Sequence, residues 1–478
     1  MAFSIQDINP AMAEVVLALG ICVVLLVDLF VSDRWRDVTY LLSMAVLALT
    51  AWVAGDIGAD VQTVTFSGSF VVDPLARILK LFAMAVVATV FLYSRGYLKD
   101  RDLHKGEYYL LGLFGLLGIM VMISAYSFLT MYLGMELLSL SLYALVAFDR
   151  ESPVGAEAAI KYFVLGAIAS GALLYGMSLI YGMTGTLQIT EIAAALRQAG
   201  PDQVITLIGL AFILVGIAFK FGAVPFQMWL PDVYQGAPTC VTLFIGTAPK
   251  LAAFALVVRV LVEGMGSVAL SWEAMLSVMA ILSLGIGNVV AIVQTNIKRM
   301  LAYSAIGHVG FIFLGFSTGT RAGLEASLFY TIVYVIMAAA AFGITILMSR
   351  KGFESDQLDD FKGLNQRSPW FALMMLLVMF SMIGFPPMAG FYAKWWVLAE
   401  VINAGHIGLA ITGIVFSVIG AFYYLRIVKL MYFDDAVDST KLVAPADMRF
   451  VLSLNGLVIL ALGVFPDGLI AICNRAFG

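Results

Sequence analysis

The chain has 478 residues, of which 62% are hydrophobic and 12% are charged, and its formal net charge is -4. A water-soluble protein carries about twice that share of charged residues, so this chain has too little polar surface to cover a soluble globule. The small net charge and the lack of a basic tail argue against nucleic acid as a partner. We therefore expect a lipid bilayer to surround much of the outer face.

The N-terminal segment carries acidic residues and lacks the positive region of a cleaved signal peptide. Its first expected span contains Cys22, and the other two cysteines are Cys240 and Cys473. The three lie far apart in or beside apolar runs, without a CxxC pair. We interpret them as small buried hydrophobic residues rather than disulfides or iron–sulfur ligands.

Apolar segments long enough to cross a membrane follow one another along the whole chain. A crossing helix needs about 20 mostly apolar residues, and about 14 segments meet that rule. We therefore predict an all-α polytopic membrane protein with short connections. The expected spans are centred, in chain order, near Val23, Val46, Val86, Leu117, Glu136, Ala169, Val215, Phe254, Gly285, Phe311, Met337, Met382, Val415 and Val458.

Lysine and arginine are divided unevenly between alternate connections. The even-numbered connections contain only Arg197 and Arg321, and Arg475 lies on the C-terminal tail. Cationic connections stay on the cytoplasmic or matrix side, so we expect the odd-numbered connections there and both termini on the periplasmic side of a bacterial inner membrane. The residues in the odd-numbered connections are Arg34, Arg36, Arg95, Lys99, Arg101, Lys105, Arg150, Lys298, Arg299, Arg350, Lys351, Lys362, Arg367, Lys441 and Arg449.

Four ionisable residues lie far from the ends of their expected spans. Glu136 is about ten residues from either end of the fifth span, or roughly 15 Å deep at the rise of a helix. Lys220, Lys250 and Lys394 lie inside the seventh, eighth and twelfth spans. Such residues are costly unless they are paired or hydrated, and one acid cannot neutralise three lysines. They are either buried ion pairs that fix helix register or, because burial penalises a charged amine, groups that take up and release protons.

Other charges lie nearer the ends of spans. Asp73, Arg77 and Lys80 begin the third span, whereas Arg259 and Glu263 end the eighth. We expect them to anchor the helices at the interface, with the long side chains reaching out to water.

Two weaker candidates lie in the sixth and tenth spans. Glu157 and Lys161 are an i,i+4 pair near the expected cytoplasmic edge, and either anchor the helix or form a proton entry point. His308 lies near mid-span, where both a hydrogen-bonded core residue and a proton relay remain open.

Proline interrupts two of the spans. The seventh should break near Pro225 and the twelfth near Pro386 and Pro387, because proline removes a backbone donor and clashes with the preceding turn. In lipid a broken helix survives only inside the bundle or beside a wet cavity. Each break lies within a few turns of Lys220 or Lys394, so an ion site is plausible there.

The two interrupted helices occupy equivalent places in two sets of five spans. Each is fourth in its set when the fourth to eighth spans are compared with the ninth to thirteenth. In the third helices, Glu157 matches Glu325. Tyr162 likewise matches Tyr330, whereas Lys161 meets a phenylalanine. An odd number of helices gives the sets opposite topology, which is typical of transporters with inverted repeats.

This pattern predicts four parts of the chain. Residues 1–104 form the N-terminal helices, and 105–265 form the first five-helix repeat. Residues 266–435 form the second, inverted repeat, and 436–478 contain the C-terminal helix.

Three stretches carry a resemblance to a known family. KFGAVPFQMWLPDVYQGAPTCVTLFIGTAPKLAAF (220–254), NIKRMLAYSAIGHVGF (296–311) and IGFPPMAGFYAKWWV (383–397) resemble the N-type subunit of proton-translocating NADH:quinone oxidoreductase, or respiratory complex I. The resemblance runs from about the third span to the end, and PDVYQGAP is the most specific element. Subunits of multisubunit sodium/proton antiporters are also similar.

The resemblance implies roles for the buried charges. Glu136 looks like the family's glutamate that pairs with a lysine of the interrupted helix, here Lys220. Lys250 looks like the central relay lysine, and Lys394 like the terminal lysine of the second half.

It implies further path residues as well. Glu157, Lys161 and His308 match polar positions along the family's proton path. Gln227 stands where many relatives carry histidine, and a glutamine cannot titrate.

The resemblance finally implies a function without a redox centre in this chain. Protons would move through the buried relay, driven by quinone reduction elsewhere in the complex. NADH, FMN, the iron–sulfur clusters and quinone would belong to partner subunits, and the neighbours would be other membrane-arm subunits. A sodium/proton antiporter subunit and an inert scaffold are the alternatives.

Overall fold

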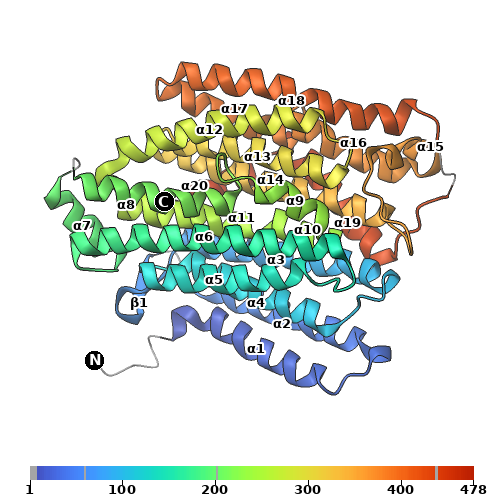
Figure 1. Cartoon of the computed structure of the whole chain (residues 1–478), viewed down its shortest axis with the longest axis horizontal. Coiled ribbons are helices and arrows are strands. Elements are labelled where there is room, and N and C mark those ends of the chain that lie inside the picture. The colour runs from blue at the N-terminus through green and yellow to red at the C-terminus, as the bar shows by residue number, and fades with distance from the viewer. Residues whose placement is uncertain (1–7, 59–60, 201–202, 437–439) are drawn as a thin grey trace.

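The computed structural model describes residues 8–58, 61–200, 203–436 and 440–478. The helices of these ranges lie side by side along a common direction (Figure 1). Among them, 13 helices or runs of consecutive helices are long and apolar enough to cross a membrane. The twelfth predicted span is present as two shorter helices, so the expected all-α polytopic fold is confirmed.

The N-terminal part begins at one edge of the bundle with α1 and α2 (blue in Figure 1), and its third helix, α3, reaches the central helices α11 (Ala248–Val257) and α14 (Arg321–Met348). Asp73 begins its third long helix as the N-cap, because its carboxylate accepts a hydrogen bond from the Ala76 backbone N–H at 2.8 Å. The helices are α1 (Met12–Asp28), α2 (Asp37–Asp56) and α3 (Pro74–Asp100), with short 3-10 turns at Asn9–Ala11, Asp33–Trp35 and Phe66–Gly68 and an antiparallel pair of strands, β1 (Thr63–Thr65) and β2 (Phe70–Val72).

The next part contains the first interrupted helix. It begins with α4 (Gly106–Ser124), α5 (Phe128–Val146) and α6 (Pro153–Thr184), continues through α7 (Ile189–Ala199), and reaches the two halves of the interrupted span, α8 (Val204–Phe221) and α9 (Trp229–Gly236). It ends with α10 (Thr239–Gly246), α11 (Ala248–Val257) and a π-helical turn at Val258–Gly264.

The following part repeats this order. After a 3-10 turn (Gly266–Val268) come α12 (Ala269–Ile292), α13 (Ile297–Phe316) and α14 (Arg321–Met348), then a 3-10 turn (Leu358–Phe361) and α15 (Leu364–Arg367). The second interrupted span is α16 (Pro369–Ile383) with α17 (Ala389–Asn403), and α18 (Ile407–Phe433), α19 (Ala446–Val464) and α20 (Asp467–Ala476) complete the chain.

Backbone pairing supports the repeat that the sequence predicts. Ser127, just before α5, forms a β-bridge with Gln188, just after α6. Asn296, just before α13, forms the same bridge with Gln357 after α14, across an equal length of chain. The connection after the third helix of each set therefore folds back onto the start of the second.

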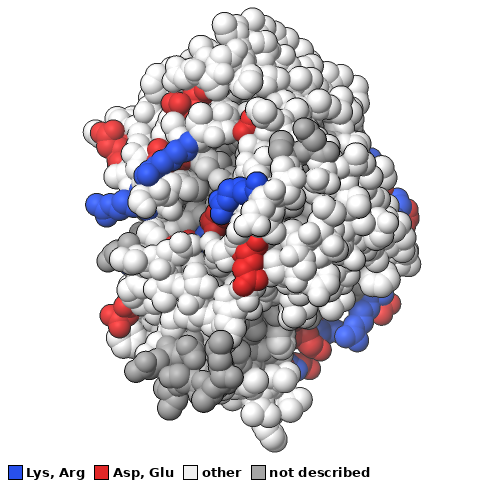
Figure 2. Space-filling model, turned by 90° about the vertical axis from the view of Figure 1, so that its left-hand side faces the viewer, with Lys and Arg blue, Asp and Glu red and all other residues white. Residues whose placement is uncertain are grey.

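Burial separates central helices from peripheral ones. The spans Thr239–Gly264 and Arg321–Met348 are 94% buried within the chain, whereas Ala446–Val464 is 22% buried. Figure 2 views the end of the bundle that carries α7 and β1, and shows isolated charged side chains on an otherwise uncharged surface. The first of these central spans carries Lys250 and Arg259.

Two features of the fold were not expected from the sequence. The connection after α6 contains the amphipathic helix α7, and the eighth span has its own break, because Thr247 leaves helical geometry between α10 and α11. The π-helical turn then follows in the same span. Pro249 was the available signal for the break, since proline is favoured in the first turn of a helix.

The first two helices of the first repeat approach each other through glycine. A side-chain carbon at Gly118 would lie 2.6 Å from the Leu138 backbone nitrogen and 2.7 Å from the Gly134 carbonyl oxygen. Only glycine at this position lets the two backbones meet so closely.

A branched residue at Gly118 should therefore force α4 and α5 apart. We expect Gly118→Val to lower the free energy of unfolding by more than about 2 kcal/mol, because overpacking against backbone cannot relax through side-chain motion. Thermal unfolding of the purified chain in detergent measures this. Gly171→Val is the matched control, since nothing lies within 4 Å of the added carbon, and equal melting temperatures for the two variants would contradict the prediction.

Candidate functional site

The first interrupted helix carries Lys220 at the end of α8. The helix stops at Phe221, and Gly222 leaves it with a φ of 70°. The Lys220 ammonium donates a hydrogen bond to Ser139 Oγ of α5 at 2.5 Å. A cation in the last turn is stabilised there, because the carbonyls at the C-terminal end of a helix carry partial negative charge.

Glu136 lies one turn before Ser139 on α5. Its carboxylate accepts a hydrogen bond from Ser170 of α6 at 2.6 Å. Within the described ranges it forms no direct ion pair with Lys220, which instead binds Ser139, one turn away on the same helix. The pairing that the family resemblance implies is therefore an interaction across Ser139 in this conformation, not a salt bridge.

The break also binds Lys250 of α11. This side chain is 1% exposed, and its ammonium donates a hydrogen bond to the backbone carbonyl of Phe221. Phe221 is the last residue of α8, so the carbonyl is one that the break leaves without a helical partner. Lys220 and Lys250 thus meet at the same break, which the sequence alone did not indicate.

Lys394 of α17 makes the corresponding contacts at the second break. Its ammonium lies 3.0 Å from the Met382 carbonyl oxygen, 2.9 Å from that of Ile383, and 2.8 Å from Ser417 Oγ of α18. Ile383 is the last residue of α16, just as Phe221 is the last of α8. In each repeat, a buried lysine therefore binds the final carbonyl of the first half-helix.

His308 lies beside Lys394 in the second repeat. Its Nδ1 is 2.8 Å from the Tyr330 hydroxyl, and its Nε2 is 3.1 Å from the Tyr424 hydroxyl. His308 and Lys394 line the same small polar cavity, with a volume of about 10 Å³. That volume is comparable to the space that one water molecule needs.

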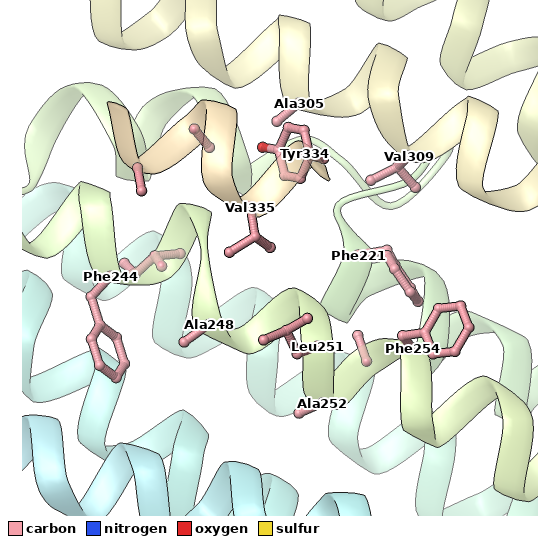
Figure 3. Close-up of a cluster of buried hydrophobic side chains, with 14 of the residues drawn as sticks. Phe221, Phe244, Ala248, Leu251, Ala252, Phe254, Ala305, Val309, Tyr334 and Val335 are labelled. Atoms are coloured by element: carbon pink, nitrogen blue, oxygen red, sulfur yellow. The ribbon is translucent and has the colours of Figure 1, made fainter. Parts of the chain in front are cut away.

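The two breaks are separated by apolar side chains. Figure 3 shows Leu251 and Phe254 of α11 near Val335 of α14 and Val309 of α13, with Phe221 at the end of α8. These side chains belong to one buried cluster, and no hydrogen bond among the described residues joins Lys250 to His308. The predicted step between these residues therefore crosses a mostly apolar region, to which Tyr334 contributes a hydroxyl.

Glu157 and Lys161 lie at the other end of the first repeat. Lys161 is 2.8 Å from the Glu157 carboxylate and 2.8 Å from that of Asp232 on α9. Asp232 also binds Arg299 of α13 at 2.6 Å. Two cations from different helices therefore share the one Asp232 carboxylate. The pair is thus part of a larger, partly exposed ionic cluster that joins the two repeats.

Sequence reasoning missed several polar residues of the site. Asp232 stands within the quoted PDVYQGAP element, but only the fold brings it to Lys161 and Arg299. Lys298 was counted as a loop charge, yet it is 4% exposed and donates to the Ala237 carbonyl at 3.0 Å. Gln227 lies in the first break, and its buried Oε1 has no hydrogen-bond partner among the described residues.

The charges near the ends of the third and eighth spans form buried ion pairs. Arg259 is 1% exposed and contacts Asp73 at 2.7 Å and Glu263 at 2.6 Å. Lys80 is 4% exposed and contacts Glu14 of α1 at 2.5 Å. The expectation of interface anchoring is therefore wrong for Lys80 and Arg259, because partners from other helices hold them inside the bundle.

These ion pairs stabilise the ionised form of the Asp73 carboxyl. Burial would raise its pKa, but Arg259, the Ala76 backbone N–H and Lys80 together lower the pKa below its ordinary value. The stabilising effect is present at neutral pH and is lost as the pH falls through the lowered pKa. No group of three or more His, Cys, Asp or Glu in the described parts of the chain could hold a metal ion.

Comparison with known proteins identifies the relatives of this arrangement. The family model described as "NADH:quinone oxidoreductase/Mrp antiporter, TM" matches residues 125–420. NADH-quinone oxidoreductase subunit N of Thioalkalivibrio sulfidiphilus is 56% identical over 477 residues, covering 100% of this chain and 99% of the relative. The subunit N of Methylovorus glucosotrophus is 52% identical, covering 98% of each chain.

Solved structures agree in fold. A chain of respiratory complex I from Thermus thermophilus is 30% identical, with a TM-score of 0.82 over 96% of this chain and 98% of its own length. A chain of the Mrp complex from Dietzia is 20% identical, with a TM-score of 0.83 over 99% and 97%. At that identity the second likeness concerns the fold alone.

The buried Asp73–Arg259 pair can be tested by removing one charge. Asp73→Asn retains an N-cap acceptor, but Arg259 then keeps only Glu263, so we expect a loss of about 3–5 kcal/mol in the free energy of unfolding. Unfolding in detergent at neutral pH measures it. Asp33→Asn is the control, since Asp33 is 94% exposed and should leave stability unchanged. A wild-type stability of Asp73→Asn would refute the role of the pair.

Proposed function

Since the chain belongs to the family of NADH-quinone oxidoreductase subunit N, we propose that its buried lysines carry the protons that this subunit translocates. The chain is a multi-pass membrane-arm subunit of bacterial complex I, and its partners are the other subunits of that complex. The residues assigned to the transfer are Glu136, Lys220, Lys250, Lys394, His308, Glu157 and Lys161.

One observation supports the proposal most directly. In both breaks a buried lysine donates to the last carbonyl before the break, from Lys250 to Phe221 and from Lys394 to Ile383. The carbonyl stabilises the ammonium form, because it lies at the negative end of a helix. A small movement of either half-helix changes that bond, so the geometry couples the position of the helix to the affinity of the lysine for a proton.

The proposed order starts at the ionic cluster of Glu157, Lys161 and Asp232. A proton moves from there to Lys220, whose charge Glu136 favours across Ser139. If a conformational event in a partner subunit weakens the influence of Glu136, Lys220 releases its proton toward Lys250. These groups titrate as a coupled set rather than one by one.

The second half of the order crosses the apolar cluster of Figure 3. From Lys250 the proton passes to His308 and Lys394, and then leaves on the far side. Water must enter this apolar cluster during turnover, because a proton does not cross apolar side chains unaided. An energy source outside the chain is required, since one charge exchanges about 2.3 kcal/mol with each 100 mV of membrane potential.

The redox chemistry is assigned to other subunits. NADH, FMN, the iron–sulfur clusters and quinone would bind to partner chains, and this chain would respond to quinone reduction through contacts with its neighbours. The relatives named subunit N favour this function over that of a sodium/proton antiporter subunit, because the likeness to the Mrp chain concerns the fold alone.

The proposal divides the chain as the sequence pattern did. Residues 1–104 and 436–478 flank the two repeats, 105–265 and 266–435, and each repeat contributes one break. The matched bridges of Ser127 and Asn296 support this division.

Replacing Lys220 or Lys250 with alanine should reduce proton translocation. We expect each variant to lose at least about threefold in protons moved per NADH oxidised, because a titratable group in the relay is removed. The measurement uses inverted vesicles with equal amounts of assembled complex. Lys351→Ala, which removes an exposed loop lysine, is the control. Unchanged translocation in both variants, at normal assembly, would end the relay proposal.

The orientation is a separate prediction. Because the cationic connections should face the cytoplasm, Lys351→Cys should resist an impermeant maleimide in intact spheroplasts and react after lysis. Gln198→Cys on α7 should react in intact spheroplasts. Both residues are exposed. Cys22 is exposed as well, so the expectation of a buried side chain is wrong for this cysteine, and a Cys22→Ser background removes its thiol. The opposite labelling pattern would reverse the proposed orientation.

A further inference from the structure

The second repeat contains a group of polar side chains that the relay above does not use. Tyr424 and Tyr423 of α18, Ser304 of α13 and Asn288 of α12 are each at most 6% exposed. All four line the cavity that His308 shares with Lys394. Buried polar groups are costly inside a bilayer unless they are satisfied, so their concentration here needs an explanation.

These side chains form a connected series that begins at His308. The Tyr424 hydroxyl lies 3.1 Å from His308 Nε2 and is also hydrogen-bonded to Ser304 Oγ. The ring of Tyr423 packs 4.2 Å from that of Tyr424, centre to centre. The Tyr423 hydroxyl in turn donates to Asn288 Oδ1 at 3.1 Å.

The series leads toward one end of the bundle. Asn288 is one turn before Ile292, where α12 ends. The connection that follows is one of those rich in lysine and arginine, and Arg426 of α18 donates to the Ile292 carbonyl at 3.0 Å and to the Gln294 carbonyl. The polar series therefore spans most of the way from the Lys394 cavity to the expected cytoplasmic end.

The surrounding backbone is shaped to hold Asn288. A side-chain carbon at Gly420 would lie 2.3 Å from Asn288 Oδ1, and one at Gly307 would lie 3.0 Å from its Nδ2. Two glycines on different helices thus leave the slot that the amide fills. The fold keeps a polar side chain at this depth, although an apolar residue there would require no partner.

The hydrogen bonding of His308 differs between its two sides. Toward α14, His308 is hydrogen-bonded to Tyr330 at 2.8 Å, and its ring lies 5.1 Å from that of Tyr334, which belongs to the cluster of Figure 3. No hydrogen bond among the described residues continues from these tyrosines to Lys250. Toward α18, His308 is hydrogen-bonded directly to Tyr424. Protons move readily along hydrogen-bonded hydroxyls, which can donate and accept in turn without taking on a net charge.

We propose that Tyr424, Ser304 and Tyr423 form a second proton-conducting branch, which connects the lysine-rich end of the bundle to His308 and Lys394 without passing Lys250. This inference rests on the proposed function, in which His308 and Lys394 carry protons. Tyr424 is the relay residue that contacts His308. Asn288 is a positioning residue, because its Oδ1 holds the Tyr423 proton turned away from Tyr424.

Each transfer along this branch conserves protons. Tyr424 gives its hydroxyl proton to His308 Nε2 and accepts one from Tyr423, either directly or through Ser304, which takes a proton from Tyr423 as it gives its own. Tyr423 first rotates its hydroxyl away from Asn288 to give this proton, and then regains one from the water side. Because every donor is refilled as it gives, no tyrosinate persists in the bilayer, and the transferred positive charge rests on His308 or Lys394.

The test compares four variants of the assembled complex in inverted vesicles. They are Tyr93→Phe, Tyr424→Phe, and each of these combined with Lys250→Ala. Tyr93 is a fully buried tyrosine of α3 outside both breaks, so it controls for the loss of a buried hydroxyl. Protons moved per NADH oxidised are measured at equal content of assembled complex.

The proposal predicts residual translocation in the Lys250→Ala/Tyr93→Phe variant, carried by the second branch. Tyr424→Phe in the same Lys250→Ala background should reduce this residual translocation by at least about threefold. Equal translocation in the two double variants would overturn the proposed branch. A complete loss of translocation in Lys250→Ala/Tyr93→Phe would overturn it as well. Normal translocation in Lys250→Ala/Tyr93→Phe would instead refute the proposed role of Lys250.

A second substitution covers the case in which Tyr424→Phe does not assemble. Ser304→Ala removes only the hydroxyl that bonds to Tyr424, and it should also lower translocation in the Lys250→Ala background. A purely structural role would reduce the amount of assembled complex without changing the protons moved per NADH. That outcome would count against the branch.

Discussion

A bilayer supplies no water to the backbone, so every carbonyl that a broken helix releases must find a partner within the protein. At both breaks that partner is a lysine, Lys250 at Phe221 and Lys394 at Ile383. The carbonyl needs a donor and the buried ammonium needs acceptors, so each satisfies the other. The rest of the architecture depends on this bond, because neither the break nor the charge would be tolerated at this depth alone.

The buried charges fall into two physical classes. Lys80 and Arg259 are paired with carboxylates, and a proton lost from Lys80 would leave Glu14 charged and buried. Lys250 and Lys394 have hydrogen-bond partners that are neutral, and Lys220 binds a serine hydroxyl directly. The charge of Lys250 or Lys394 can change without stranding a counter-ion, and Lys220 has no carboxylate bonded to it directly. The first class fixes the frame of the bundle, and the second is the class to which we assign proton transfer.

The apolar cluster between the breaks separates the polar groups of the first repeat from those of the second. Leu251, Phe254 and Val335 separate two polar centres that are each well hydrogen-bonded. A permanent wet path would let protons run back down the membrane potential, so a separation that opens only during turnover protects the gradient. The hydroxyl branch through Tyr424 gives the second centre its own connection to one end of the bundle. The two repeats then resemble two half-paths that meet at a controlled step.

Composition, apolar periodicity and proline were enough to predict the spans, both principal breaks and which charged residues lie deep within the spans. These are local properties, because a lysine within 20 apolar residues is anomalous wherever its helix packs. The sequence did not predict the hydrogen-bond and ion-pair partners, because they join segments far apart in the chain. Examples are Asp232 with Lys161, Lys250 with a carbonyl of α8, and Tyr424 of α18 with His308. The sequence by itself determined which side chains are costly in lipid. Only the tertiary structure decided which atoms relieve that cost, because hydrogen bonds depend on the positions of helices that no local pattern encodes.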